Sequence, residues 1–291
     1  MIAIAVLASE VPRAVAAATA TASALGLRAD EAIVLHVSNR LALRLLPSDV
    51  LARVAPVTHG AAELEVEVAT RLAATDSPVA LLDPRMAPRV YERDGFAITL
   101  WTYYEHQPAR ELSPAGYADA LSRLHVGMQH VDVTTPHFTD RVREAQRLVG
   151  NRDRTPELGE ADRDLLVNTF RRVMRAIAGR DAAEQLLHGE PHPGNVINTK
   201  NGPLFIDLET SCRGPVEFDL AHVPKEVSAC YAGIDQALLD DCRVLVLAMV
   251  AAWRLDPEDR FPSGRQAAAE LLAALRAGPP YPALGAISGL D

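Results

Sequence analysis

The sequence predicts an α+β protein in two parts, a small antiparallel sheet with one inserted helix followed by a larger, mainly helical region. Three observations support this. Short β-like runs dominate the first hundred residues, helical patterns dominate after about residue 105, and one strong hairpin signal interrupts those helices near residue 200. We expect the boundary near 103–107, which gives domains 1–104 and 105–291.

The elements of the first part follow from local patterns. An Ala-rich helix is expected over 11–25, and the segment AIVLHVSNRLALRLL predicts a hairpin around Ser38-Asn39. Residues 61–74 have helical periodicity, with Leu64, Val68 and Leu72 on one stripe. Asp94-Gly95 is typical of a tight turn. The further predicted strands are 49–57, 79–82, 89–92 and 96–102.

In the second part, Ser113-Pro114 is a good helix start, because serine caps the first turn and proline fits it. A helix should then run to about residue 129. Further helices are expected at 138–150, 160–186, 225–255 and 264–276.

The net charge of −9 lies mostly in the second part. Residues 1–104 hold 11 acidic and 9 basic residues, whereas residues 105–291 hold 27 and 20. This surplus disfavours nucleic acid as a partner and mildly favours a cationic ligand. The only lysines are Lys200 and Lys225, so a cation needed in the first part must be an arginine.

Three irregularly spaced cysteines, Cys212, Cys230 and Cys242, argue against a disulfide framework or a zinc site. The N-terminus has an apolar start without a preceding positive region, and no apolar run is long enough to span a membrane. We therefore expect a cytoplasmic protein without membrane contact, and the oligomeric state stays open.

The segment LLHGEPHPGNVINTKNGPLFIDLET (186–210) carries the strongest chemical signal. Asn201-Gly202 predicts a two-residue hairpin turn, since both residues tolerate positive φ. That register sets Asp207 opposite Val196, one step from Asn195. A carboxylate and a carboxamide oxygen suit Mg²⁺, which completes its shell with water and substrate phosphates. Glu190, in a nearby Pro/Gly-rich loop, could orient or deprotonate a hydroxyl group.

These motifs resemble those of the aminoglycoside phosphotransferase family, part of the protein-kinase-like superfamily. The family pattern H-G-D-x-x-x-x-N reads HGEPHPGN here, the I-D metal ligand reads FID, and the G-P…D-L-A stretch reads GPVEFDLA. The resemblance is specific over about 188–221 and weaker over 32–124. It implies a bilobal kinase-like fold that uses ATP or GTP with Mg²⁺.

The resemblance also implies roles for single residues of the second part. Glu190 takes the place of the catalytic aspartate, and His188 would brace its loop. Asn195 and Asp207 match the magnesium ligands. Asp219 would anchor the loop, and Glu209 lies where some relatives hold a second metal.

In the first part, Arg53 stands where the family has a third-strand lysine, and Glu65 best matches its partner on the inserted helix. Ser38, with Asn39, would occupy the phosphate loop. Trp101 and Tyr103 fall in the implied linker, whose backbone would read the adenine edge. The family pattern is broken twice, by glutamate at 190 and by arginine at 53.

The sequence therefore favours a phosphotransferase that moves a γ-phosphate to a hydroxyl of a small, amine-bearing, aminoglycoside-like molecule. Kinases of choline, amino alcohols or sugars share the same signature. A nucleotide-binding regulatory protein with little turnover is the alternative that Arg53 and Glu190 motivate. A metal hydrolase ranks low, because Pro191 and Pro193 forbid the helix that a zinc-protease motif needs.

Overall fold

The computed structural model describes residues 6–38, 40–107, 112–259 and 261–287. Contacts divide the chain into two compact units. The first comprises Met1–Glu111, His130–Val133 and Ile197–Thr210, and the second comprises Leu112–Gln129, Thr134–Val196 and Ser211–Asp291, both over their described parts. The predicted boundary after residue 104 stays a prediction. None of the helices in the described ranges is long and apolar enough to cross a membrane.

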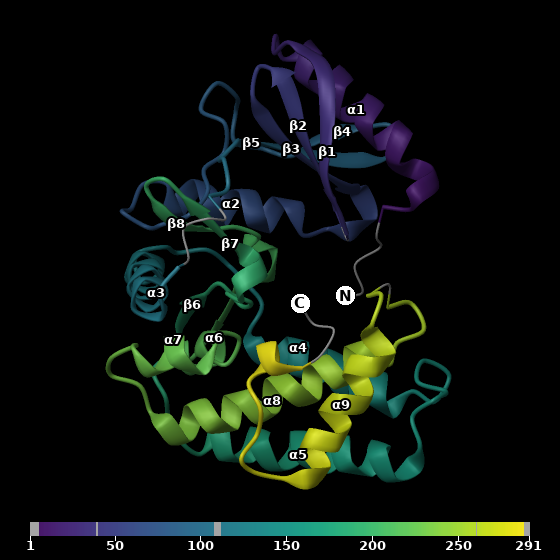
Figure 1. Cartoon of the computed structure of the whole chain (residues 1–291), viewed down its shortest axis with the longest axis vertical. Helices are drawn as coiled ribbons and strands as arrows, with labels where there is room; N and C mark the ends of the chain where they lie inside the picture. Colours follow the sequence, from purple (N-terminus) through teal and green to yellow (C-terminus); the bar gives the residue numbers. More distant parts are fainter. Residues whose placement is uncertain (1–5, 39, 108–111, 260, 288–291) are drawn as a thin grey trace. The chain divides into compact units, whose positions relative to one another are not determined.

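The first unit is built on a five-stranded antiparallel sheet of order β1-β2-β3-β5-β4, coloured purple to blue in Figure 1. Two helices accompany it, α1 (Val11–Ala24) and α2 (Ala62–Leu72). The strands are β1 (Ala29–Val37), β2 (Leu41–Pro47), β3 (Val50–Pro56), β4 (Tyr91–Arg93) and β5 (Phe96–Thr102). Short 3-10 turns lie at Ala8–Glu10, Val57–His59 and Leu208–Thr210, the last labelled η4.

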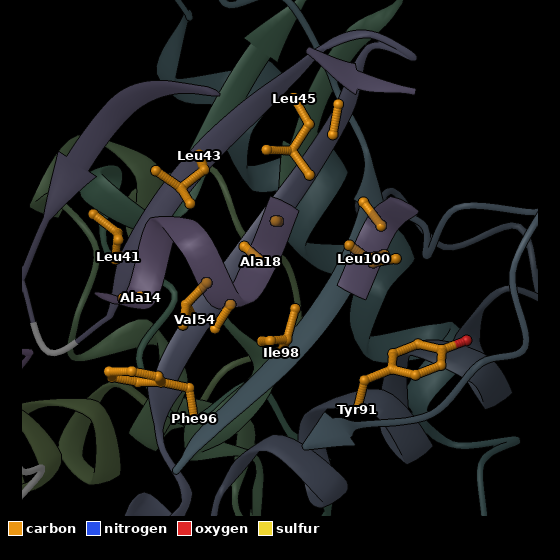
Figure 2. Packing of buried hydrophobic residues seen from close by; sticks show 14 of the residues in the cluster. Ala14, Ala18, Leu41, Leu43, Leu45, Val54, Tyr91, Phe96, Ile98 and Leu100 are labelled. Atoms are coloured by element: carbon orange, nitrogen blue, oxygen red, sulfur yellow. The ribbon is translucent and has the colours of Figure 1, made fainter. Parts of the chain in front are cut away.

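Helix α1 packs on one face of this sheet. Its alanines allow a close approach, and Ala14 and Ala18 are fully buried over β2, β3 and β5 (Figure 2). Alternation along β2 turns Leu41, Leu43 and Leu45 toward the same core. This layer of small helical residues on aliphatic strand residues holds the sheet that carries the candidate site.

The same alternation decides where Arg53 points. Val50, Ala52 and Val54 of β3 are fully buried on the α1 side, so the intervening Arg53 projects from the opposite face. That is the face from which it reaches Glu65 of α2. An arginine inside an apolar strand is thus explained by a partner on the second helix.

The second unit is mainly helical. Its long helices are α3 (Pro114–Met128), α4 (Phe138–Gly150), α5 (Glu160–Ala178), α8 (Gln236–Arg254) and α9 (Gly264–Ala277). Helices α5 and α9 pack on the extensively buried α8. The smaller elements are β6 (Gln185–Leu187), η3 (Pro193–Asn195), β9 (Cys212–Gly214), α6 (Val216–Leu220), α7 (Lys225–Ala229) and η5 (Leu284–Ala286).

The predicted α+β class is confirmed, as is the serine cap at Ser113, whose hydroxyl accepts from Gly116 N at 3.1 Å. Two predicted helices are too long. The helix expected over 160–186 ends at Ala178, because Gly179 caps it and Asp181 adopts positive φ; residues 185–187 form β6 instead. Residues 225–255 split into α7 and α8 around Gly233, also at positive φ.

The hairpin near residue 200 exists, but its turn lies one residue earlier than predicted. Strand β7 (Val196–Thr199) ends two residues before β8 (Gly202–Phe205), so the loop is Lys200-Asn201. Only Gly202 takes positive φ, at 112°. Residues 79–82, expected as a strand, form only isolated bridges, Val79 to Phe205 and Leu82 to Trp101.

Candidate active site

Backbone bonds at the end of β8 bring Asp207 into the first unit. Phe205 is fully buried; its N–H donates to Pro78 O at 2.8 Å and its carbonyl accepts from Ala80 N at 2.9 Å. Two residues later Asp207 adopts φ of +65°, a left-handed conformation that aspartate tolerates better than most residues. The chain then turns into η4, which packs beside α2.

Five charged side chains meet there, and we call them the arginine–carboxylate cluster: Arg40, Arg53, Glu65, Asp207 and Glu209. Arg53 pairs with Glu65 Oε1 through Nη1 and with Asp207 Oδ1 through Nη2, the latter at 2.9 Å. Glu65 is fully buried and Asp207 is the most exposed member, with 28% of its side chain accessible. The predicted partners Arg53 and Glu65 are therefore in contact, and Asp207 joins them.

Arg40 is the member that sequence reasoning missed. It lies just before β2, is 7% exposed, and pairs with Glu65 Oε2 and with Glu209. Its Nη1 also lies 4.0 Å from Asp207 Oδ1. Glu209, which the sequence could assign equally to a surface, is largely covered, with 13% of its side chain exposed. In the sequence, Arg40 is only a charged residue at the edge of an apolar strand. Many surface arginines occupy such positions, so the pattern could not identify it.

The electrostatics of the cluster suit a bound phosphate and a cation together. Burial would lower the pKa of Arg53, but Glu65 and Asp207 outweigh it, and the net effect raises the pKa. The Arg53 guanidinium therefore stays charged, and the cluster as a whole sets two arginines against three carboxylates. Planar guanidiniums bind phosphate oxygens in bidentate fashion, and a carboxylate excess leaves room for an additional cation.

The other predicted nucleotide-binding residues of this unit have contacts that do not point to a ligand. Trp101, 4% exposed, donates through Nε1 to Thr99 Oγ1 at 2.8 Å, and Arg53 lies 5.9 Å from the centre of its ring. Tyr103 stacks under Arg44 at 4.0 Å. Ser38 N donates to Arg40 O, while Asn39 lies outside the described residues. None of these contacts singles out a ligand, so their roles stay predictions.

In the second unit, Asp219 holds the loop that carries His188 and Glu190. Fully buried on α6, it accepts from His188 N at 2.9 Å and from Gly189 N at 2.8 Å. His125 Nε2 contributes a third bond at 3.0 Å. Burial would raise the pKa of Asp219, but the bond from His125 and the nearby His188 and His222 lower it. The anchoring contact that the resemblance implied is present.

The loop itself is fixed by its own polar groups. Gly189 adopts φ of +92°, where a side chain would be strained. His188 is fully buried, and its Nδ1 lies 3.4 Å from the amide of Glu190. Asn195 Nδ2 donates to Glu190 O at 3.0 Å. That bond directs the carboxamide and leaves Oδ1 as the atom suited to a hard cation.

Glu190 forms an ion pair with Arg141 of α4, a second residue that the sequence did not suggest. Arg141 also donates to Gly189 O at 3.3 Å and lies 5.0 Å from the ring centre of Trp253. Burial would raise the pKa of Glu190, but Arg141 and His222 lower it below its usual value. The carboxylate is therefore ionised at neutral pH and held in a defined position.

His222, given no role from sequence, is buried beside this pair, and its Nδ1 donates to Phe218 O at 2.9 Å. Burial lowers its pKa to about 4, although Glu190 and Asp219 oppose the shift. The imidazole is thus neutral at physiological pH, as a buried histidine beside an arginine should be.

The lowered pKa of His222 predicts a pH-dependent stability. Between about pH 6.5 and pH 4 the unfolded chain binds more protons than the folded one, so the free energy of unfolding falls as pH falls. The loss over this window should reach about 3 kcal/mol at most. His222→Gln should flatten the curve in urea unfolding at a series of pH values. The exposed His36→Gln serves as control, and an unchanged slope in His222→Gln would refute the assignment.

Protein side chains alone do not supply a full set of metal ligands in the described parts of the chain. Within the described ranges, no group of three or more His, Cys, Asp and Glu side chains could hold a metal ion. The predicted metal ligands lie in different units, Asp207 in the first and Asn195 in the second. This donor chemistry fits Mg²⁺, which takes one or two protein oxygens and completes its shell with water and phosphate.

Residues 31–241 match the model of a family described as phosphotransferase enzymes. No curated protein sequence matches the chain. Among solved structures, an amicoumacin kinase in complex with AMP-PNP, Ca²⁺ and its antibiotic is similar at 10% identity and a TM-score of 0.71, over 97% of this chain and 100% of that one.

Two further structures are similar at comparable levels. A choline/ethanolamine kinase family protein from Mesorhizobium loti has 19% identity and a TM-score of 0.65, covering 95% and 98% of the two chains. An aminoglycoside phosphotransferase with GDP and kanamycin has 17% identity and a TM-score of 0.66, covering 85% and 93%. These likenesses show a fold of the protein-kinase-like type.

Proposed function

The chain belongs to the phosphotransferase enzyme family, and from that premise we propose that it transfers the γ-phosphate of ATP, or of GTP, to a hydroxyl group of a small amine-bearing molecule. The observation that carries this proposal is the contact of Arg53 with both Glu65 and Asp207 inside one unit. A partly buried guanidinium beside a partly buried carboxylate is an arrangement that can bind phosphate and a divalent cation side by side.

Within this proposal Arg53 binds phosphate oxygens and Glu65 keeps it in place from α2. Asp207 and Asn195 are the residues that would hold Mg²⁺. Magnesium would neutralise charge on the phosphates during transfer. Ser38, Trp101 and Tyr103 remain our proposed nucleotide contacts, on the resemblance alone.

Glu190 would accept the proton of the acceptor hydroxyl or align that hydroxyl, and His188 would brace its loop. Phosphoryl transfer has a loose transition state, so alignment matters more than base strength. A carboxylate with a lowered pKa can therefore serve, because it stays ionised and Arg141 fixes its position. The glutamate side chain is longer than the family's aspartate by about 1.5 Å, which the loop must accommodate.

The amine on the acceptor is supported by charge. Residues 105–291 hold 27 acidic against 20 basic residues, which favours a cationic substrate. The descriptions of similar structures name kanamycin, choline/ethanolamine and fructosamine, all nitrogen-bearing. These names support an amine-bearing class without selecting a member of it.

The direct test is transfer of labelled γ-phosphate to a panel of acceptors with Mg²⁺ and ATP or GTP. We expect at least one amine-bearing compound to accept the phosphate, among kanamycin, ethanolamine, choline and fructosamine. Glucose and glycerol serve as uncharged controls. Transfer to the uncharged controls alone would contradict the amine-bearing class.

The ion pair between Arg141 and Glu190 favours a second function, because it engages the carboxylate that would act on the acceptor hydroxyl. Arginine in place of lysine at position 53 points the same way. In that case the protein binds nucleotide as a regulator and turns it over little. Nucleotide that raises the melting temperature without phosphate transfer to any acceptor, and without ADP formation, would support this alternative.

Arg53→Ala should weaken ATP binding far more than adenosine binding, because only ATP carries the phosphates that the guanidinium contacts. A charged hydrogen bond contributes about 1.5–3 kcal/mol, so the Kd for ATP should rise about 10- to 100-fold. Calorimetric titration with each ligand measures the difference. Arg93→Ala, an exposed arginine on β4, is the matched control. Equal losses for ATP and adenosine would remove Arg53 from the phosphate site.

A further inference from the structure

The second unit contains a pocket of about 590 Å³ that the proposed reaction does not use. It is walled by the end of α3, residues 180–185, the start of α6 and the segment between α7 and α8. Neither Glu190 nor Arg141 nor Asn195 lines it. Its volume is in the range of small-molecule sites.

One wall residue, Glu217, is an unusual carboxylate. It is 7% exposed, and its Oε1 accepts one hydrogen bond, from Asp235 N at 3.0 Å. No arginine, lysine or histidine in the described parts of the chain forms an ion pair with it. Buried carboxylates are costly unless a cation compensates them.

The other charges of the pocket wall are already satisfied. Glu184 accepts from His137 Nε2 at 3.0 Å. Arg180 reaches Asp235 at 3.5 Å and Asp241 at 3.1 Å. The single wall arginine is therefore committed to other carboxylates, and the negative charge of Glu217 is the one left for a ligand.

We propose that this pocket binds a small molecule bearing a primary ammonium group, which pairs with the Glu217 carboxylate. The ammonium supplies the missing counter-charge. Gln129, whose Nε2 donates to Gln185 Oε1 at 2.8 Å, keeps its side-chain oxygen as a further acceptor in the pocket wall. The site is separate from the proposed phosphotransfer site, and the proposal does not depend on that function.

The pocket is also connected to the loop that carries Glu190. Tyr231, in the pocket wall, donates its hydroxyl to His125 Nδ1 at 2.8 Å, and His125 Nε2 donates to Asp219 at 3.0 Å. Asp219 in turn holds the amides of His188 and Gly189. One neutral tautomer of His125 satisfies the whole chain of bonds. A ligand that orders the Tyr231 wall therefore stabilises the loop.

Putrescine is a suitable probe because it carries two ammonium groups and no hydroxyl, so it cannot accept phosphate on oxygen. Calorimetric titration of the full chain should show putrescine binding, and no binding of the equally long, neutral 1,4-butanediol. Glu217→Gln keeps the acceptor for Asp235 N but loses the charge, and should raise the Kd for putrescine at least tenfold.

Asp119→Asn is the matched control. It removes one charge from an exposed side chain of α3 outside the pocket, and it should leave the Kd unchanged. Melting temperatures establish that both variants fold. Absence of binding to the wild-type chain, equal binding of 1,4-butanediol, or an unchanged Kd in folded Glu217→Gln would overturn the proposal.

Hydrogen exchange tests the connection to the loop. Saturating putrescine should slow exchange of the His188 and Gly189 amides severalfold in the wild-type chain. Tyr231→Phe removes the hydroxyl that donates to His125 and should abolish this added protection. Unaltered exchange in the wild-type chain with putrescine bound would overturn the coupling.

Discussion

Asp207→Asn is expected to lower magnesium-dependent phosphate transfer by about 10²- to 10³-fold or more. The substitution removes the carboxylate charge that would attract the cation, and it turns a cluster with excess negative charge into a neutral one. Asparagine tolerates the left-handed φ of +65° at this position, so the backbone should stay in place. ADP formation across a magnesium titration, with melting temperature alongside, measures the effect.

Asp94→Asn is a matched control for this experiment. Asp94 also has positive φ, at 53°, but it lies in the exposed turn between β4 and β5. The control should keep full activity and magnesium dependence. If Asp207→Asn behaves like Asp94→Asn, the assignment of Asp207 to the metal is refuted.

Glu190→Gln is expected to lower kcat by about 10²- to 10⁴-fold with little change in nucleotide affinity. Glutamine retains the length of the side chain but cannot accept the acceptor's proton, and it leaves Arg141 without its carboxylate partner. Steady-state kinetics gives kcat, and nucleotide titration gives the Kd independently.

Two results would contradict this role. An unchanged kcat would show that another group handles the hydroxyl. A Kd for nucleotide that rises as much as kcat falls would indicate a structural role instead. Glu226→Gln changes an exposed residue of α7, removes the same charge elsewhere in the unit and should change neither quantity.

Local patterns were sufficient for much of the fold. The strand runs of β2 and β3, the alanine-rich α1 and the serine cap of α3 are properties of short segments, so the sequence predicted them correctly. The helix predicted over 160–186 failed because apolar periodicity continues past Gly179, whereas the helix ends at Ala178 and Asp181 takes a positive φ. The turn prediction failed by one residue, because Lys200-Asn201 and not Asn201-Gly202 separates the two strands.

Some residues of the candidate site could likewise be identified from the sequence, and others could not. The spacing of Glu190, Asn195 and Asp207, with Asp219 downstream, is a contiguous pattern that the sequence by itself determined. Pairing Arg53 with Glu65 needed only the order of strand and helix, together with the resemblance. The roles of these residues in catalysis stay predictions for the experiments above.

Only the tertiary structure decided which charges surround these residues. Arg40 and Arg141 are ordinary arginines in sequence, and His222 and Glu217 lie in an apolar helical stretch. Their significance comes from burial and from partners far away in the chain, Glu65 for Arg40 and Glu190 for Arg141. Charge interactions depend on distance and on solvent exclusion, and neither is a property of sequence spacing.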